Sequence, residues 1–138
     1  MANSIFLDTN GWLALLNSTE ELHEQADRVW QRIIRTNQRI VLTDWIVAEA
    51  GNSLARFRQR HRLQIALDRI LSNPRGELVF IDHDLLQRAF AIFAQHSDKS
   101  YGLVDCASFV VMRDRGITDA FTSDVHFEQA GFARLLTP

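Results

Sequence analysis

The chain has 138 residues, of which 46% are apolar, and this length fits one domain of ordinary size. We therefore expect a single domain over residues 1–138, with an apolar fraction too high for a disordered chain. The net charge of −2 excludes a generally basic nucleic-acid binder. A single cysteine, Cys106, excludes an intrachain disulfide.

Two further absences concern location. No apolar stretch approaches the roughly 20 residues of a membrane span. The N-terminal residues 1–4 lack the basic region that begins a signal peptide. From these features and the single cysteine we expect a cytoplasmic protein that does not use a membrane.

Strand-like and helix-like segments alternate along the chain. We expect strands at 5–9, 39–43, 78–81, 119–122 and 133–136, and helices at 11–16, 21–35, 44–56, 61–71, 82–96 and 103–115. Asp44 is a plausible N-cap of its helix, and Gly116 closes the last long one. Such alternation predicts an α/β fold with a mainly parallel sheet covered on both faces.

Four acidic residues occur at separate places that would meet at one edge of this sheet. Asp8 and Asp124 each end an apolar strand, Glu49 lies early in the helix after the second strand, and Asp105 begins the last long helix. The carboxyl ends of parallel strands form the edge at which such folds bind ligands. Because clustered carboxylates repel one another unless a cation or protons neutralise them, the set predicts a divalent-metal site.

Each acid also has an ordinary explanation when it is taken alone. Asp8 is a normal helix cap, and Glu49 is a normal exposed helical residue. Asp105 is different, because the helix around it is apolar almost all round and a buried acid is costly without a partner. His126 has three readings: a ligand, a substrate contact, or a capping or surface residue. Cys106 reads as a core residue rather than a nucleophile.

Small polar residues flank two of the acids. Thr9 and Asn10 follow Asp8, where they could orient its carboxylate or cap the next helix. Thr122 and Ser123 precede Asp124, where they could hold a neighbouring carboxylate. We therefore predict that these four residues support the acidic site.

Arginine is concentrated in segment 56–62, and Lys99 is the only lysine in the chain. The planar guanidinium suits phosphate, and the interleaved Phe57 and His61 could stack on bases. A solvated helix face and turn is the equally weighted alternative. The candidate RNA-binding residues are Arg56, Arg58, Arg60 and Arg62.

Taken together, the motifs resemble those of PIN-domain ribonucleases, and within them the VapC-type toxins of toxin–antitoxin pairs. The resemblance covers essentially the whole chain and rests on Leu7-Asp8-Thr9-Asn10, on Glu49, on Val104-Asp105-Cys106-Ala107 and on Thr122-Ser123-Asp124-Val125-His126-Phe127. One departure is Gly102, which stands three residues before the third acid, where relatives often have Ser. The departure removes a possible helix cap and leaves the acids untouched.

The resemblance implies a three-layer α/β/α sandwich with about five strands. It implies that Asp8, Glu49, Asp105 and Asp124 bind Mg²⁺ or Mn²⁺ and catalyse hydrolysis of RNA phosphodiester bonds by a metal-activated water. It also implies an RNA substrate, a cognate antitoxin and a homodimer. Apolar residues such as Trp30, Phe90, Ile92 and Phe93 could form an interface, although core packing explains them equally well.

Three alternatives stay open at this point. A haloacid-dehalogenase-like phosphohydrolase also carries an Asp after its first strand, but Asn10 occupies the place of its second Asp and Lys99 would have to be its lysine. A PIN-fold module could bind RNA or protein without cleaving. A nuclease could be a toxin or an RNA-processing enzyme. The RNA cleaved and the number of metal ions do not follow from the residues.

Overall fold

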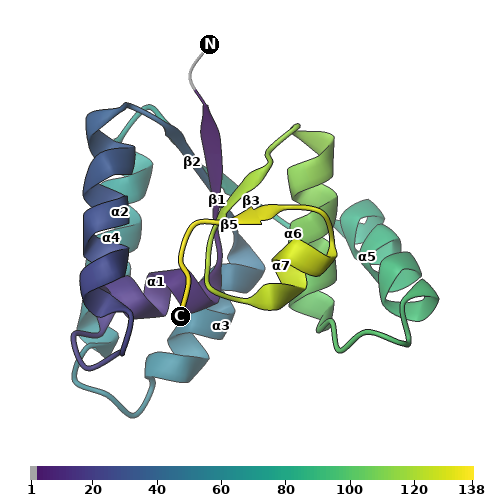
Figure 1. The fold of residues 1–138 in the computed structure, drawn as a ribbon, viewed down its shortest axis with the longest axis horizontal. Coiled ribbons are helices and arrows are strands. Elements are labelled where there is room, and N and C mark those ends of the chain that lie inside the picture. Colours follow the sequence, from purple (N-terminus) through teal and green to yellow (C-terminus); the bar gives the residue numbers. More distant parts are fainter. Residues whose placement is uncertain (1–2) are drawn as a thin grey trace.

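The computed structural model describes residues 3–138 and shows a five-stranded sheet between two layers of helices (Figure 1). All neighbouring strands are parallel, in the order β3-β2-β1-β4-β5. The predicted α/β sandwich with a parallel sheet is confirmed. Met1 and Ala2 lie outside the described residues. They are two of the four N-terminal residues in which we expect no basic region of a signal peptide. The strands are β1 Ser4–Leu7, β2 Arg39–Thr43, β3 Gly76–Val79, β4 Asp119–Phe121 and β5 Ala133–Arg134.

The direction in which the chain crosses the sheet decides which helices cover each face. From β1 the chain moves outward to β2 and β3, and then returns past β1 to β4 and β5. Right-handed crossovers therefore place α1–α4 on one face and α5–α7 on the other, as Figure 1 shows. Within residues 3–138, no helix has the length and apolar character to span a bilayer. The helices are α1 Thr9–Leu16, α2 His23–Arg35, α3 Asp44–Leu54, α4 Arg60–Ser72, α5 His83–Gln95, α6 Leu103–Asp114 and α7 Val125–Gln129.

The predicted N-cap of α3 is wrong. The cap is Thr43, whose Oγ1 accepts a hydrogen bond of 3.2 Å from the backbone N–H of Ile46. Asp44 instead accepts a 2.9 Å hydrogen bond from the backbone N–H of Ile81 and so ties α3 to the segment after β3. The helix begins at Asp44 as expected, but its cap lies one residue earlier, because a strand-ending threonine can cap as well as an aspartate.

Several element boundaries also differ from the predicted ones. β1 ends at Leu7, because Thr9 already belongs to α1. β3 begins at Gly76 rather than Leu78, and β5 is limited to Ala133–Arg134. These shifts occur where the apolar pattern is short, since hydrogen bonds to neighbouring strands, and not the pattern alone, decide where a strand begins and ends.

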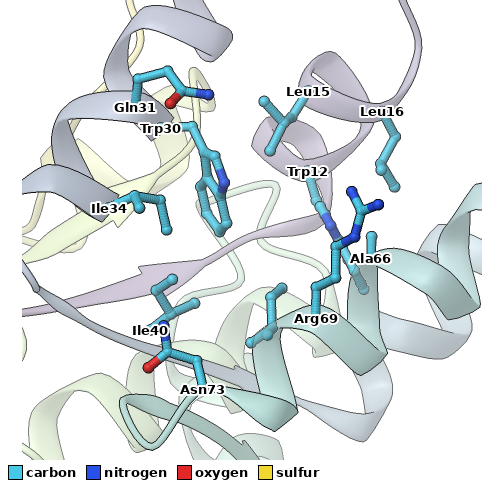
Figure 2. Close-up of a pocket in the computed structure, with 11 residues that line it drawn as sticks. Trp12, Leu15, Leu16, Trp30, Gln31, Ile34, Ile40, Ala66, Arg69 and Asn73 are labelled. Atoms are coloured by element: carbon cyan, nitrogen blue, oxygen red, sulfur yellow. The ribbon is translucent and has the colours of Figure 1, made fainter.

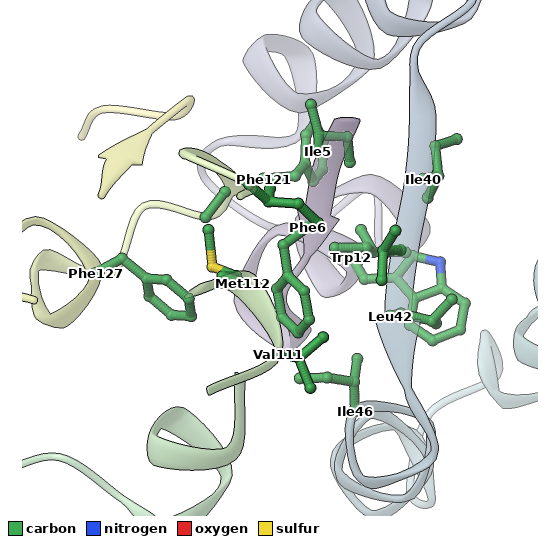
Figure 3. Close-up of a cluster of buried hydrophobic side chains, with 14 of the residues drawn as sticks. Ile5, Phe6, Trp12, Ile40, Leu42, Ile46, Val111, Met112, Phe121 and Phe127 are labelled. Atoms are coloured by element: carbon green, nitrogen blue, oxygen red, sulfur yellow. The ribbon is translucent and has the colours of Figure 1, made fainter. Parts of the chain in front are cut away.

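The core lies on both faces of β1, the central strand. Ile5, Phe6 and Leu7 are fully buried, and Figure 3 shows side chains from α1, β2, α6 and α7 converging around this strand. In α6 every residue from Cys106 to Met112 is buried, as its apolar sequence predicts. The acid that follows β1 and the acid that begins α6 thus adjoin the buried core.

A close approach at Gly11 holds α1 against β4. A Cβ atom at this position would lie 2.0 Å from the backbone oxygen of Phe121. We expect Gly11→Ala to lower the free energy of unfolding by about 3 kcal/mol or more, because backbone must move to relieve the overlap. Urea unfolding measures this change.

Gly51→Ala is the matched control. Its Cβ would meet Leu63 at 3.5 Å, an ordinary contact, within α3. Alanine favours helix over glycine by about 0.5–1 kcal/mol, so this variant should be as stable as the wild type or more stable. Equal stability of both alanine variants would contradict the close approach at Gly11.

Candidate functional site

Asp8 lies at the carboxyl end of β1, between that strand and α1. Its side chain is buried, with 4% of its surface exposed, and its Oδ2 accepts a 2.7 Å hydrogen bond from the Thr122 hydroxyl. The pKa of Asp8 is raised to about 7, chiefly by burial. The Thr122 hydrogen bond lowers it, and the carboxylates of Asp105, Asp124 and Glu49 add to the rise. A negative charge here is therefore costly unless a cation accompanies it.

The strand β4 ends beside Asp8 and carries a polar network. Thr122 is fully buried, and while its hydroxyl donates to Asp8 it accepts a 3.1 Å hydrogen bond from the backbone N–H of Asp124. Asn10 Oδ1 accepts from the backbone N–H of Ser123 at 2.8 Å and from its hydroxyl at 2.9 Å. These contacts lock the segments after β1 and β4 to each other, and so fix the separation of Asp8 and Asp124.

Asp105 occupies the first turn of α6, on the opposite face of the sheet from α3. Its Oδ2 accepts a 3.0 Å hydrogen bond from the backbone N–H of Gly102. The carboxylate therefore supplies the contact for a helix start whose N-cap residue has no side chain. Burial raises the pKa of Asp105 above its ordinary value, and repulsion from Asp124 and Glu49 adds to this effect, while the Gly102 hydrogen bond and His126 lower it.

Glu49 completes the set from α3. It is partly buried rather than fully exposed, and it borders the same pocket as Ser53, one turn further along the helix. The pocket has a volume of about 430 Å³ and lies between the ends of β1 and β4, where the strand order reverses. It is lined by Asp8, Thr9, Asn10, Leu13, Glu49, Ser53, Asp105, Asp124 and His126.

His126 is the residue of this pocket whose role the sequence left undecided. Its Nδ1 lies 3.3 Å from Asp124 Oδ1 and 3.4 Å from Asp105 Oδ2. Ligand atoms of His126, Asp105 and Asp124 all lie within 4.8 Å of one another, and Asp8 and Glu49 line the same pocket without belonging to this close group. The sequence feature that could have indicated this role is the position of His126. It stands two residues after Asp124, an acid at a strand end, in the first turn of the short helix α7.

Other candidate residues lie outside this cluster or make no contact with the acids. Thr9 borders the pocket, but its buried Oγ1 has no hydrogen-bond partner in the described structure. The Cys106 thiol is fully buried, and burial raises its pKa to about 11, so it remains a protonated core residue. Lys99 lies on the surface 3.8 Å from Asp98, away from the pocket lining. It is therefore poorly placed for the phosphohydrolase alternative.

The arginine segment lies just beyond the acidic pocket. Exposed side chains follow the end of α3, whose Ser53 borders the pocket, and Phe57 is half-exposed. Arg60 donates a 2.8 Å hydrogen bond to the backbone oxygen of Ala55 and so closes the turn into α4. The structure leaves all four candidate arginines at the surface, Arg56, Arg58, Arg60 and Arg62, and none of them lines the pocket.

A second pocket lies away from the acids, between α1, α2 and α4 (Figure 2). It has a volume of about 370 Å³ and apolar walls that include Leu15, Trp30 and Ile34. Arg69 and Gln31 supply polar groups at its opening. Figure 2 shows Trp30 and Arg69 facing the same hollow from opposite helices. We call it the α1–α2–α4 groove.

Comparison with known proteins places this arrangement in a family. The model of the PIN domain matches residues 5–133 and so includes all four acids and the whole sheet apart from the first residue of β1 and the last of β5. The chain belongs to the PIN-domain family. Membership excludes the haloacid-dehalogenase-like alternative. It also means that the four carboxylates lie in a fold used by nucleases.

A VapC toxin is among the relatives of this chain within the PIN-domain family. The chain is 30% identical over 134 residues to the 23S rRNA-specific endonuclease VapC20 of Mycobacterium tuberculosis, covering 95% of this chain and 97% of that protein. The crystal structure of that VapC20, described as a sarcin–ricin loop cleaving toxin, superimposes with a TM-score of 0.81 over 98% of this chain and 100% of VapC20.

Two VapBC structures share the fold at lower identity. VapBC2 from Rickettsia felis, bound to a DNA fragment from its promoter, gives a TM-score of 0.67 at 14% identity, covering 94% of this chain and 96% of the other. DNA-bound VapBC from Salmonella typhimurium also gives 0.67, at 16% identity and 96% coverage of both chains. The predicted resemblance to VapC-like PIN domains is confirmed.

Proposed function

We propose that this protein is an endoribonuclease that requires a divalent metal ion and acts as the toxin of a toxin–antitoxin pair. One observation carries the proposal: four carboxylates from four elements border one pocket at the switch point of the sheet. Among residues 3–138, no lysine or arginine lines this pocket. A pocket so rich in negative charge suits a cation and, through it, an anionic phosphate.

The donor atoms fit Mg²⁺ or Mn²⁺. Carboxylate oxygens are the preferred ligands of both ions, and we propose Asp8, Glu49, Asp105 and Asp124 as the residues that hold them. A bound cation would lower the raised pKa of buried Asp8. It would also give a partner to Nδ1 of His126, which has none among the described residues. When bound, the ion supplies activation of water and neutralisation of charge on the scissile phosphate.

The residues around the acids orient them. Thr122 holds one oxygen of Asp8 through its hydroxyl, and Gly102 holds one oxygen of Asp105 through its backbone N–H. Asn10 spans from α1 to Ser123, so the two strand ends cannot separate. We propose that Thr122, Ser123 and Asn10 act as positioning residues, because their hydrogen bonds hold Asp8 and the segment that leads to Asp124. The Thr9 hydroxyl has no hydrogen-bond partner among residues 3–138, so this structure gives Thr9 no contact for the supporting role expected from the sequence.

The test is cleavage of RNA by the purified protein. We expect fragments with 5′-phosphate ends in Mn²⁺ or Mg²⁺, and none after removal of the metal with EDTA. The VapC20 relative is named a 23S rRNA-specific endonuclease, so ribosomal RNA is the first substrate to try, beside transfer RNA. Binding of Mn²⁺ and RNA without cleavage would instead support a non-cleaving PIN module.

The exposed arginines next to the pocket are proposed to hold the RNA backbone. We expect the triple substitution of Arg56, Arg58 and Arg62 with Gln to weaken RNA binding at least tenfold at low salt and to flatten its salt dependence, since each lost phosphate contact lowers the salt slope by about 0.7 for single strands. Arg60 is left in place because it closes the turn after α3.

A control with the same change in net charge is available at the other end of the sheet. Arg32 and Arg35 lie in the last turn of α2, and Arg39 begins β2, at the edge opposite the acids. Their triple substitution with Gln should leave RNA affinity nearly unchanged. Equal losses in the two triple variants, measured by filter binding over a salt series, would show that only net charge matters.

An antitoxin is the protein partner we propose. Two solved relatives with this fold are VapBC complexes, and the α1–α2–α4 groove offers apolar walls with Arg69 at its opening. The groove suits an amphipathic segment that carries an acidic residue. Co-expression with the small protein encoded beside this gene should yield a stable complex that no longer cleaves RNA. Separate elution of the two proteins would contradict the pairing.

A homodimer and a cytoplasmic location complete the proposal. Phe90 and Phe93 on α5 are 46% exposed, and Phe80 after β3 is 67% exposed, so core packing does not account for these rings. We propose that a second copy covers them. Light scattering of the purified protein should give twice the chain mass, and a monomeric mass at micromolar concentration would contradict the dimer. Fractionation of cells would test the location.

A further inference from the structure

His126 presents a buried nitrogen to two of the four acids. Its Nδ1 lies 3.3 Å from Asp124 Oδ1 and 3.4 Å from Asp105 Oδ2, yet it forms a hydrogen bond with neither. Leaving a buried polar atom without a partner costs free energy comparable to a lost hydrogen bond. Thr9 is 5% exposed and borders the same pocket, and its Oγ1 also has no hydrogen-bond partner in the part of the chain that the structure describes.

The other side of the imidazole ring is held in place. Its Nε2 lies 2.7 Å from the hydroxyl oxygen of Ser100, and the ring packs edge-on against Tyr101 with 5.6 Å between centroids. When Nε2–H donates to Ser100, the lone pair of Nδ1 faces the two carboxylates. Metal-binding histidines are typically oriented in this way, by a hydrogen bond from the nitrogen that does not bind the metal.

The spacing of the three side chains suits one ion. Neighbouring ligands at about 2.0–2.2 Å from a single metal are roughly 3.0–3.5 Å apart, in octahedral or tetrahedral geometry. Both distances from Nδ1 to the carboxylate oxygens fall in this range. The separations of His126 Nδ1 from Asp105 and Asp124 are therefore those of ligands that share an ion, and all three ligand atoms lie within 4.8 Å of one another.

We propose that His126 is a nitrogen ligand of the divalent metal ion, beside Asp105 and Asp124. This inference rests on the metal site proposed above and deepens it. Imidazole favours transition metals, whereas purely carboxylate sites suit Mg²⁺. The site should accordingly prefer Mn²⁺ or Co²⁺ to Mg²⁺ more strongly than four carboxylates alone would.

The competing arrangement is an ion pair. A protonated His126 between the two carboxylates would neutralise part of their charge and would have to be displaced when a cation binds. The two arrangements predict opposite effects of removing the His126 imidazole on metal affinity. Removal of a ligand weakens metal binding, whereas removal of a competing cation strengthens it.

The first test is pulsed electron paramagnetic resonance of the wild-type protein loaded with Mn²⁺. A directly bound imidazole produces ¹⁴N modulation, which His126→Gln should abolish and His96→Gln should retain. His96 is the matched control because it also packs against Tyr101 but borders no carboxylate of the pocket. Bound Mn²⁺ without ¹⁴N modulation in the wild type would overturn the ligand role and leave the proposed nuclease standing.

Calorimetry supplies the second test. His126→Gln should weaken Mn²⁺ and Co²⁺ binding by roughly 10–100-fold, as loss of a group that tunes a metal site does, and should change Mg²⁺ binding far less. Tighter Mn²⁺ binding by this variant would overturn the proposal in favour of the ion pair. A wild type that binds no Mn²⁺ at all would overturn both the ligand role and the metal-dependent function.

Discussion

Asp8→Asn is expected to reduce RNA cleavage in Mn²⁺ by at least about 10³-fold, equivalent to about 4 kcal/mol of transition-state stabilisation. The amide has nearly the same shape but carries no negative charge for a cation. Asp8 is also the most buried of the four acids, since it is 4% exposed, and its Oδ2 accepts a hydrogen bond from Thr122. Rates of cleavage with saturating metal measure the effect.

The control for this variant is Asp68→Asn. Asp68 is an exposed carboxylate on α4 that does not line the acidic pocket. It loses the same charge, so any general effect of net charge on RNA affinity appears in both variants. Cleavage by Asp68→Asn should equal that of the wild type, and wild-type cleavage by Asp8→Asn would contradict the assignment of the site.

The same substitution is expected to stabilise the metal-free protein at neutral and higher pH. The folded protein raises the pKa of Asp8 from an ordinary 3.8 to about 7, chiefly through burial. The folded state thus binds a proton more tightly than the unfolded state. Asp8 therefore lowers the free energy of unfolding as the pH rises from about 4 to 7, by at most about 4 kcal/mol. Asn cannot ionise and escapes this loss.

Urea unfolding in EDTA over a pH series tests this expectation. The difference in stability between Asp8→Asn and the wild type should be near zero at pH 4 and should reach its largest value above pH 7. Asp68→Asn should show no such growth. An Asp8→Asn protein less stable than the wild type at pH 8 would mean that the carboxylate is already compensated within the folded chain. Together with the loss of cleavage, a stabilised variant would exclude unfolding as the cause.

Much of the fold follows from the sequence because the chain repeats one pattern. Short apolar runs such as Ile5-Phe6-Leu7 alternate with segments whose apolar residues have helical spacing. Such alternation predicts a parallel sheet with helices on both faces. The sequence does not predict which residue caps α3, because Thr43 and Asp44 are both good caps. Asp44 is used elsewhere, since it accepts a hydrogen bond from the backbone of Ile81, and Thr43 is the cap. Short strand ends such as Ala133–Arg134 depend on hydrogen bonds that the pattern does not encode.

The site was predictable in position and less so in detail. Asp8 and Asp124 follow strands, so their meeting at one edge follows from parallel topology. The proximity of His126 to Asp105 and Asp124 depends on the path of α7 and on the loop that brings Ser100 to its ring. Those are tertiary contacts between segments with no pattern of their own. The partly buried state of Glu49 likewise depends on packing at the end of the sheet.

We expect the four acids to hold a divalent metal ion, and a crystal structure of the protein soaked in Mn²⁺ tests this site most directly. Anomalous scattering locates manganese without assumptions about ligands. We expect a peak inside the acidic pocket, with oxygens of Asp8, Asp105 or Asp124 at about 2.0–2.6 Å from it. A pocket that stays empty at millimolar Mn²⁺, or carboxylates more than about 10 Å apart, would contradict it.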